Sequence, residues 1–437
     1  MTGIIEYLEN TAADLMARCT QCGRCVEVCP IVPLVGLAGE EPKQLIAQVK
    51  RLTEGKPFSA EARRFTEACN GSGQCNAACP EGINVRQWLS ITKLKLKTEL
   101  PEDERSVTSG QQFRRMAQAV HLLASMQLPS EDLKRILAPP KSRSADLVFY
   151  YGCNVLRSPH IIFNVMDILD ALRLEYEVLG GTANCCGVVQ FMAGDLKTYE
   201  RIAPKTYGAL SGMGAKTVIS WCPTCQLQFG ETYHDYARPS FEVGHVAEFL
   251  AGYRDQIAER IVKPLAKRAV IHEHGGVKGV VESTRRLMET IPGLQIVDVP
   301  QNREFGYQCS RVAQYPEKQN DVHRIIAENA KAAGVDLIIT IYHGCHRQLC
   351  GAEGQYPYEV KNFTDVLAEA LGAGRPDLYK AYKIGGDVYE AIQSAGGYLE
   401  QNGVRVSGLD GLLKQEIFGE PGISGNQDRP ANGSFST

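Results

Sequence analysis

Seven of the fifteen cysteines lie in two short runs near the start of the chain. The first run, CTQCGRCVEVCP, is followed by a second, CNGSGQCNAACP, and a proline ends each of them. Thiolates spaced by two, two and three residues can wrap one iron–sulfur cluster and reach a neighbouring one. The spacing therefore predicts two adjacent clusters and a protein that carries electrons.

The two runs resemble the two-cluster ferredoxin module, and the second also resembles the three-iron run of succinate dehydrogenase iron–sulfur proteins. The resemblance implies that the last cysteine of each run crosses to the other cluster. A 4Fe–4S cluster would then be held by Cys19, Cys22, Cys25 and Cys79. The second cluster would use Cys29, Cys69 and Cys75, with Ser72 where a fourth cysteine is expected.

Serine is a poor ligand for iron in a thiolate cluster, so Ser72 favours a 3Fe–4S cluster over a second 4Fe–4S cluster. A 4Fe–4S cluster with one ligand that is not cysteine stays open. Zinc is the alternative to iron, but zinc sites favour two separate pairs of cysteines and not seven in two proline-ended runs.

Composition adds limits on partners and compartment. A net charge of −3 over 437 residues gives no reason to expect a nucleic acid or a lipid surface as partner. Residues 1–19 lack an apolar signal core, and no apolar stretch is long enough to span a bilayer. We expect a cytoplasmic protein that reaches a membrane only through a partner, with reduced cysteines in place of disulfides.

The hydrophobic pattern divides the chain into an N-terminal all-α domain and an α/β part. Apolar residues at three- and four-residue steps predict helices over 3–18, 43–53, 60–69, 85–99 and 110–126. A linker rich in proline and serine follows at about 138–146. Strands are then predicted at 146–151, 176–179 and 217–221, with helices at 161–172 and 196–213, which is typical of a parallel sheet.

The same order of elements returns, which predicts a duplicated α/β domain. Strands are expected at 269–272, 295–299 and 336–341, with helices at 280–290 and 319–333. Cys185 matches Cys309 and Cys225 matches Cys345 at nearly constant separation, in similar surroundings. The expected domains are 1–138, 146–265, 266–372 and an extension at 373–437, with a helix at 378–398 and disorder from about 421.

The first repeat carries a complete cysteine array. Single and paired cysteines follow the expected strands, where sites in parallel sheets usually form. They are Cys153, Cys185, Cys186, Cys222 and Cys225. Near them, Arg157, His160 and Arg311 are either groups that attract an anionic substrate or, more commonly, exposed solvated side chains.

The second repeat keeps only part of the array. Cys309 and Cys345 remain, while Gly275, Ser310 and Tyr342 stand at the other matched positions. The loss of three thiolates favours a structural half without a cluster. Two alternatives stay open: a small metal site of Cys309, Cys345 and a nearby histidine, or a thiol role for one of these cysteines.

The cysteine array resembles the CCG domain of heterodisulfide reductases, and the whole order resembles a fusion of their two-cluster ferredoxin module with their CCG-domain module. This resemblance covers about residues 15–370 and implies a non-cubane 4Fe–4S cluster on the five cysteines of the first repeat. It also implies an oxidoreductase that cleaves or forms a disulfide, a thiol or a carrier-bound sulfur species as part of a complex.

Partners follow from the same resemblance. The expected ones are other members of a heterodisulfide reductase-like complex, including a separate FAD-binding subunit, and a sulfur-carrier protein as substrate. The sequence lacks the glycine-rich motif for flavin or nicotinamide. The alternative function is that of an electron-transfer subunit in a flavin-linked glycolate, glycerol-3-phosphate or lactate dehydrogenase that feeds quinone, because those subunits share this architecture.

Overall fold

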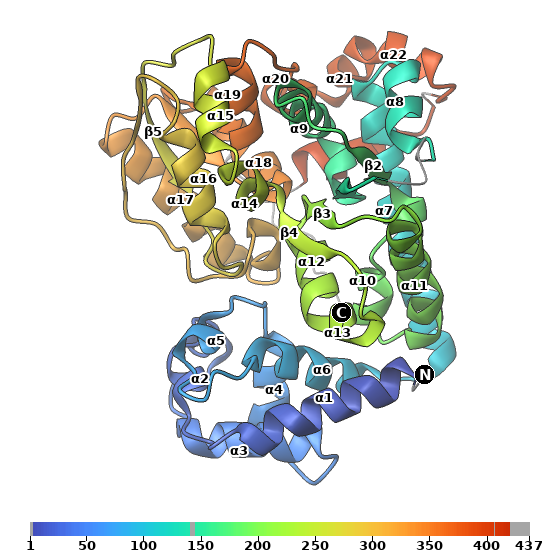
Figure 1. Cartoon of the computed structure of the whole chain (residues 1–437). Coiled ribbons are helices and arrows are strands. Elements are labelled where there is room, and N and C mark those ends of the chain that lie inside the picture. Colours follow the sequence, from blue (N-terminus) through green and yellow to red (C-terminus); the bar gives the residue numbers. More distant parts are fainter. Residues whose placement is uncertain (1–2, 140–144, 406, 420–437) are drawn as a thin grey trace.

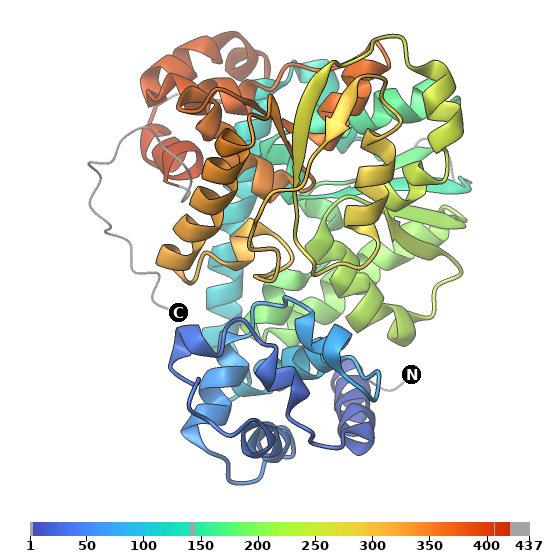
Figure 2. The same ribbon diagram turned by 90° about the vertical axis from the view of Figure 1, so that its left-hand side faces the viewer.

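The computed structural model describes residues 3–139, 145–405 and 407–419 (Figure 1). A helical N-terminal part lies against two α/β repeats, and the view after a quarter turn shows the same stacking (Figure 2). The predicted fold class is therefore confirmed. The expectation of disorder from about 421, and most of the linker predicted at 138–146, lie outside the described residues.

The N-terminal part is built from helices that begin at capping side chains. Glu41, Ser59 and Asn84 each accept a hydrogen bond from a backbone N–H of the first turn. Phe65 and Trp88 fill the small apolar core between these helices. The elements are α1 (Ile4–Arg18), α2 (Arg24–Glu27), η1 (Pro33–Val35), α3 (Pro42–Thr53), α4 (Ala60–Ala68), α5 (Gln74–Ala78) and α6 (Val85–Lys97).

A long helix, α7 (Glu102–Gln127), joins the N-terminal part to the rest, and α8 (Ser130–Leu137) follows it. The sequence pattern predicts a start at residue 110, but the helix begins eight residues earlier. Three acidic residues in the first turn, which favour the positive end of the helix dipole, explain the earlier start.

Each repeat contains a four-stranded parallel sheet, and the two sheets share one strand order. The first runs β2-β1-β3-β4 and the second β6-β5-β7-β8, so the predicted duplication is confirmed. The edge strands β4 and β8 were not predicted, because a valine is the one apolar residue in each of them. The strands are β1 (Leu147–Gly152), β2 (Glu177–Gly180), β3 (Thr217–Ser220), β4 (Glu242–His245), β5 (Lys267–His272), β6 (Leu294–Ile296), β7 (Leu337–Thr340) and β8 (Glu359–Asn362).

Helices cover both sheets and join the repeats in a pairwise manner. The helix after the first strand of each repeat contacts the helix after the last strand of the other: α9 (His160–Ala171) contacts α19 (Phe363–Ala370), and α14 (Val246–Ala251) contacts α16 (Val280–Met288). The remaining helices are η2 (Asn154–Arg157), η3 (Thr182–Asn184), α10 (Val188–Ala193), α11 (Leu196–Gly212), α12 (Pro223–Leu227), the π-helix η4 (Gln228–Tyr233), α13 (His234–Ala237), α15 (Arg254–Arg260), η5 (Cys309–Arg311), α17 (Pro316–Ala332), α18 (His343–Leu349) and η6 (Cys350–Gly354).

The C-terminal extension packs on α7 and the second repeat. Most of the range 378–398 is helical as predicted, but it is divided into separate helices. The chain breaks at Gly386, whose φ of 76° is left-handed, and Asp387 then caps a new helix. Tyr382 donates to the carbonyl of Met126 in α7 at 2.8 Å. The elements are α20 (Leu378–Gly385), α21 (Val388–Ser394), α22 (Gly396–Gln401), α23 (Asp410–Leu413) and the π-helix η7 (Lys414–Phe418).

Candidate functional site

The first predicted ligand set comes together around one cavity. It is lined by Cys19, Cys22, Cys25 and Cys79, which lie at the ends of α1, α2 and α5. Gly23 makes the turn between them at a φ of 82°, where a Cβ would lie 2.8 Å from the ring of Pro42. Burial and the neighbouring thiols raise the pKa of Cys25 to about 12. Iron would supply the positive charge that four close thiolates need.

The second predicted set lines a neighbouring cavity, and Cys25 borders both. Cys29, Cys69 and Cys75 lie there together with Ser72. Burial raises the pKa of Cys29 to about 11. Ser72 occupies the fourth position at 8 % exposure, so the departure from cysteine seen in the sequence sits at the cavity itself.

The five cysteines of the first repeat form one buried, connected group. They follow the carboxyl ends of β1, β2 and β3, as the parallel sheet requires. Sulfur contacts link Cys153 to Cys185, Cys186 to both Cys185 and Cys225, and Cys225 to Cys222. The Cys186–Cys225 sulfur distance is 3.4 Å.

The electrostatics of this group suit soft metal ions. The Cys153 thiol donates to Cys185, which raises the pKa of Cys153 and lowers that of Cys185 well below its usual range. No basic side chain is among these contacts, so the five cysteines could bind together as thiolates only with the positive charge of bound iron. All five predicted ligands thus fit an iron–sulfur cluster.

Arg86 of α6 joins all three parts of the molecule. Its guanidinium contacts the carboxylate of Glu231 at 2.5 Å and donates to the carbonyls of Gly71, beside Ser72, and of Gly276 in the second repeat. Glu231 lies on the π-helix that directly follows the Cys222–Cys225 segment. Sequence reasoning missed Arg86, because only the fold brings these segments together.

Tyr307 of the second repeat spans the distance between the second N-terminal site and the first repeat. A Cβ on Gly71 would lie 3.0 Å from its ring, and its hydroxyl is 3.1 Å from Oγ1 of Thr224. Thr224 lies between Cys222 and Cys225. One aromatic side chain therefore contacts the loops of both cysteine groups, although no sequence pattern marked it.

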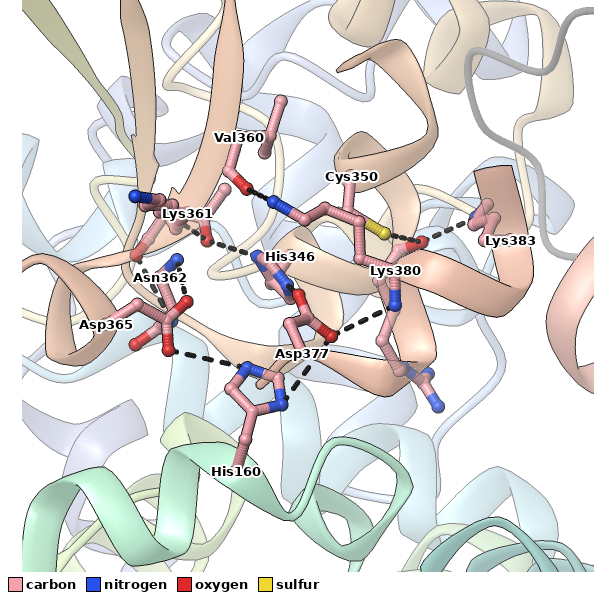
Figure 3. A network of polar contacts seen from close by, with 12 residues as sticks. His160, His346, Cys350, Val360, Lys361, Asn362, Asp365, Asp377, Lys380 and Lys383 are labelled. Carbon is pink, nitrogen blue, oxygen red and sulfur yellow. Dashed lines mark hydrogen bonds and ion pairs between the residues drawn. The ribbon is translucent and has the colours of Figure 1, made fainter. Parts of the chain in front are cut away.

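Arg157, His160 and Arg311 contact other parts of the fold, so the expectation of exposed, solvated side chains is wrong, while anion binding stays a prediction. Arg157 pairs with Glu416 at 2.9 Å, with 12 % of its side chain exposed. Arg311 lies over the Tyr307 ring and donates to the Asn70 carbonyl. His160 is buried in a polar network between the repeats (Figure 3).

That network places two histidines among two carboxylates. His160 from α9 lies 3.4 Å from Asp365 and 3.6 Å from Asp377, and His346 from α18 contacts Asp377 at 2.6 Å (Figure 3). Asp365 also caps α19, and Asp377 accepts a backbone hydrogen bond from Lys380. His160 belongs to the first repeat, whereas both carboxylates follow the second sheet, so the network links the repeats electrostatically.

Comparison with known proteins agrees with these sites. The 4Fe-4S dicluster domain matches residues 15–83, and the cysteine-rich domain matches residues 147–230 and 276–350. A subunit of the dihydromethanophenazine:CoB–CoM heterodisulfide reductase of Methanosarcina mazei is 25% identical over 413 residues, covering 85% of this chain and 98% of the relative. The chain thus carries a 4Fe-4S dicluster domain and two copies of the cysteine-rich domain, and it is similar to a heterodisulfide reductase subunit along most of its length.

Two further relatives carry different names. The glycolate oxidase iron–sulfur subunit of Escherichia coli is 21% identical over 401 residues, covering 82% of this chain and 95% of that relative. A subunit of the fumarate reductase (CoM/CoB) of Methanothermobacter marburgensis is 24% identical over 360 residues, covering 80% of this chain and 71% of that relative. In the described part of the chain, no helix is long and apolar enough to cross a membrane.

Proposed function

We propose that this chain is the iron–sulfur subunit of a heterodisulfide reductase-like complex that exchanges electrons with a sulfur substrate. Cys19, Cys22, Cys25 and Cys79 would hold a 4Fe–4S cluster, and Cys29, Cys69 and Cys75 a 3Fe–4S or second 4Fe–4S cluster. The first repeat would hold a non-cubane 4Fe–4S cluster through Cys153, Cys185, Cys186, Cys222 and Cys225.

The observation that carries this proposal is the connected group of five thiols. Five sulfurs exceed what one cubane cluster requires, and they lie in mutual contact at the carboxyl edge of one sheet. When bound, the cluster supplies electrons one at a time to a disulfide–dithiol couple, which takes up two electrons in all. The chain's own part is to hold that cluster at the end of a relay and to keep water from it, since all five cysteines are buried.

The reaction balances with a partner that supplies electrons. Cleavage of a disulfide takes two electrons and two protons and yields two thiols, and the reverse reaction returns them. The electron donor or acceptor would be a separate FAD-binding subunit. The substrate would be a disulfide, a thiol or a sulfur species on a carrier protein.

A relay through this chain is supported by how closely its parts contact one another. Cys25 borders both N-terminal cavities, and Tyr307 and Arg86 connect the second cavity to the Cys222–Cys225 loop. Electrons would pass from the first N-terminal cluster to the second and then to the first repeat.

The test is iron counting and paramagnetic resonance on protein purified without oxygen. About eleven iron atoms per chain or more are expected, and about seven would mean that the first repeat holds no cluster. Oxidised protein treated with a thiol should give a new signal that Cys153→Ser abolishes. If the addition of thiols and disulfides leaves the signals of all clusters unchanged, the sulfur-substrate proposal is refuted.

The likeness to the glycolate oxidase iron–sulfur subunit favours a second candidate. The chain would then carry electrons from a flavin-linked 2-hydroxy-acid or glycerol-3-phosphate dehydrogenase to quinone, with no substrate at the five cysteines. This candidate would be selected if such a dehydrogenase and its substrate reduce the clusters of the chain while thiols leave the signals of those clusters unchanged.

A further inference from the structure

The second repeat gathers four soft side chains at the strand ends that match the cysteine loops of the first. His272 ends β5, His274 follows it, Cys309 begins η5, and Cys345 lies in the first turn of α18. One ligand atom of each residue lies within 4.8 Å of the others. The matched position Gly275 lacks a ligand atom, but the two histidines before it replace what it lost.

The distances within this group are close to those between two ligands of one ion. Nε2 of His272 lies 3.1 Å from Sγ of Cys309, and Nε2 of His274 lies 3.4 Å from the same sulfur. A tetrahedral zinc ion, about 2.3 Å from sulfur and 2.0–2.1 Å from nitrogen, would hold such atoms about 3.6 Å apart. A two-iron cluster would place its histidine and cysteine ligands on different irons, which this close packing does not allow.

A backbone contact orients one of the histidines for metal binding. Nδ1 of His274 lies 3.0 Å from the carbonyl oxygen of Phe305, which can only accept a hydrogen bond. The proton therefore sits on Nδ1 and leaves the lone pair of Nε2 aimed at Cys309. Metal-binding histidines are fixed in this way by a second partner.

The site is closed to solvent. The exposed fractions of His272, His274, Cys309 and Cys345 are 3, 1, 0 and 1 %. Four protein ligands complete a tetrahedral shell and leave no position for a substrate, which is typical of structural zinc sites.

We propose that the second repeat binds one structural zinc ion through His272, His274, Cys309 and Cys345. Both cysteines bind as thiolates, so binding releases two protons and changes no oxidation state. The zinc ion stands at the place where the first repeat has its five cysteines, and it is independent of the sulfur substrate proposed above.

The ion has a defined task in the fold. It fixes the segment around Cys309, and that segment contacts the second N-terminal site: Tyr315 donates to the carbonyl of Ala68 at 3.0 Å, and Tyr307 contacts Gly71 and Thr224. Zinc would therefore hold the loop that spans the electron relay.

The test is elemental analysis of the full chain purified without oxygen and treated with a chelator. About one zinc atom per chain is expected beside the iron, and X-ray absorption at the zinc edge should show two sulfur and two nitrogen ligands. A chain without zinc, or a zinc ion with other ligands, would overturn the proposal. This measurement uses the wild-type chain and does not depend on how a variant folds.

Variants then assign the ligands. Cys345→Ala and His274→Gln should each lower the zinc content per chain more than about tenfold, while the iron content of the chain stays unchanged. Cys350→Ala is the matched control, because Cys350 is a buried cysteine of the same repeat outside the site, and it should keep its zinc. Loss of iron in place of zinc in Cys345→Ala would show a cluster in the second repeat and overturn the proposal.

Discussion

The two repeats share one backbone plan and differ in the side chains at their strand ends. In the first, five buried cysteines follow β1, β2 and β3; in the second, two cysteines and two histidines lie at or after the ends of β5, β6 and β7. Parallel strands fix where a site forms, while the ligand types select the metal. A duplicated fold can thus keep its site position and exchange a redox cluster for a structural ion.

The first way to break this comparison is to change the matched residues Cys185 and Cys309. Cys185→Ser should lose about four iron atoms per chain and lower disulfide-linked electron transfer more than about 100-fold. Cys309→Ser should leave the iron unchanged and lose zinc. Metal analysis of both variants measures this, and iron loss in Cys309→Ser would make the repeats equivalent after all.

The two helix contacts between the repeats also share one backbone arrangement and differ in their charged side chains. At one contact Asp365, near the start of α19, faces His160; at the matched contact Glu248 of α14 faces the turn at Gly279. One side of the pseudo-symmetric interface therefore holds a buried histidine between carboxylates, and the other does not.

The second prediction concerns that buried histidine. His160→Leu leaves Asp365 and Asp377 without its charge, and breaking a buried ion pair costs about 3–5 kcal/mol of stability. Urea-induced unfolding of wild-type and variant protein measures the loss. His121→Leu, at an exposed position of α7, is the control and should change stability by less than about 0.5 kcal/mol.

The third prediction is a pH dependence with a definite sign. Burial alone would lower the pKa of His160, but Asp377 and Asp365 outweigh both burial and Lys380 and raise it to about 8. Protonated His160 therefore stabilises the fold by about 2 kcal/mol. This contribution to the free energy of unfolding is fully present below the unfolded pKa of about 6.5, and it is lost as pH rises through 8.

Acid has the opposite effect through Asp377. Burial alone would raise its pKa, but His160 and His346 hold it well below its ordinary value, so its contribution is present near neutral pH and disappears in acid.

Unfolding measured from pH 5 to 9 should show a decline in stability above about pH 7 that is absent from His160→Leu. An equal decline in that variant would assign the effect to other groups.

The sequence predicted the fold in outline because its signals were strong. Proline-ended cysteine runs, alternating strands and helices, and matched cysteines in two repeats all carried over to the structure. The break at Gly386 and the early start of α7 escaped, since each depends on one local conformation or on the dipole of the first turn.

The candidate sites were predictable where the cysteines follow a recognisable spacing in the sequence. The five cysteines of the first repeat do so over residues 153–225, and the structure brings them into contact. Arg86 and Tyr307 could not be found, because each becomes important through segments more than a hundred residues away. His272 and His274 were visible as a pair, but their meeting with Cys309 depends on the fold of the second sheet.

The smallest expected effect comes from Ser310, which matches Cys186 of the first repeat. Cys186 is 1 % exposed, whereas Ser310 lies on the surface. Ser310→Cys should therefore restore the paired cysteines in the sequence without adding a metal ligand. Iron and zinc contents should stay within error of wild type, while the new thiol reacts with an alkylating reagent in the folded protein. An extra iron–sulfur cluster in this variant would show that the loop can turn inward, and that the repeats differ only by the residues they have lost.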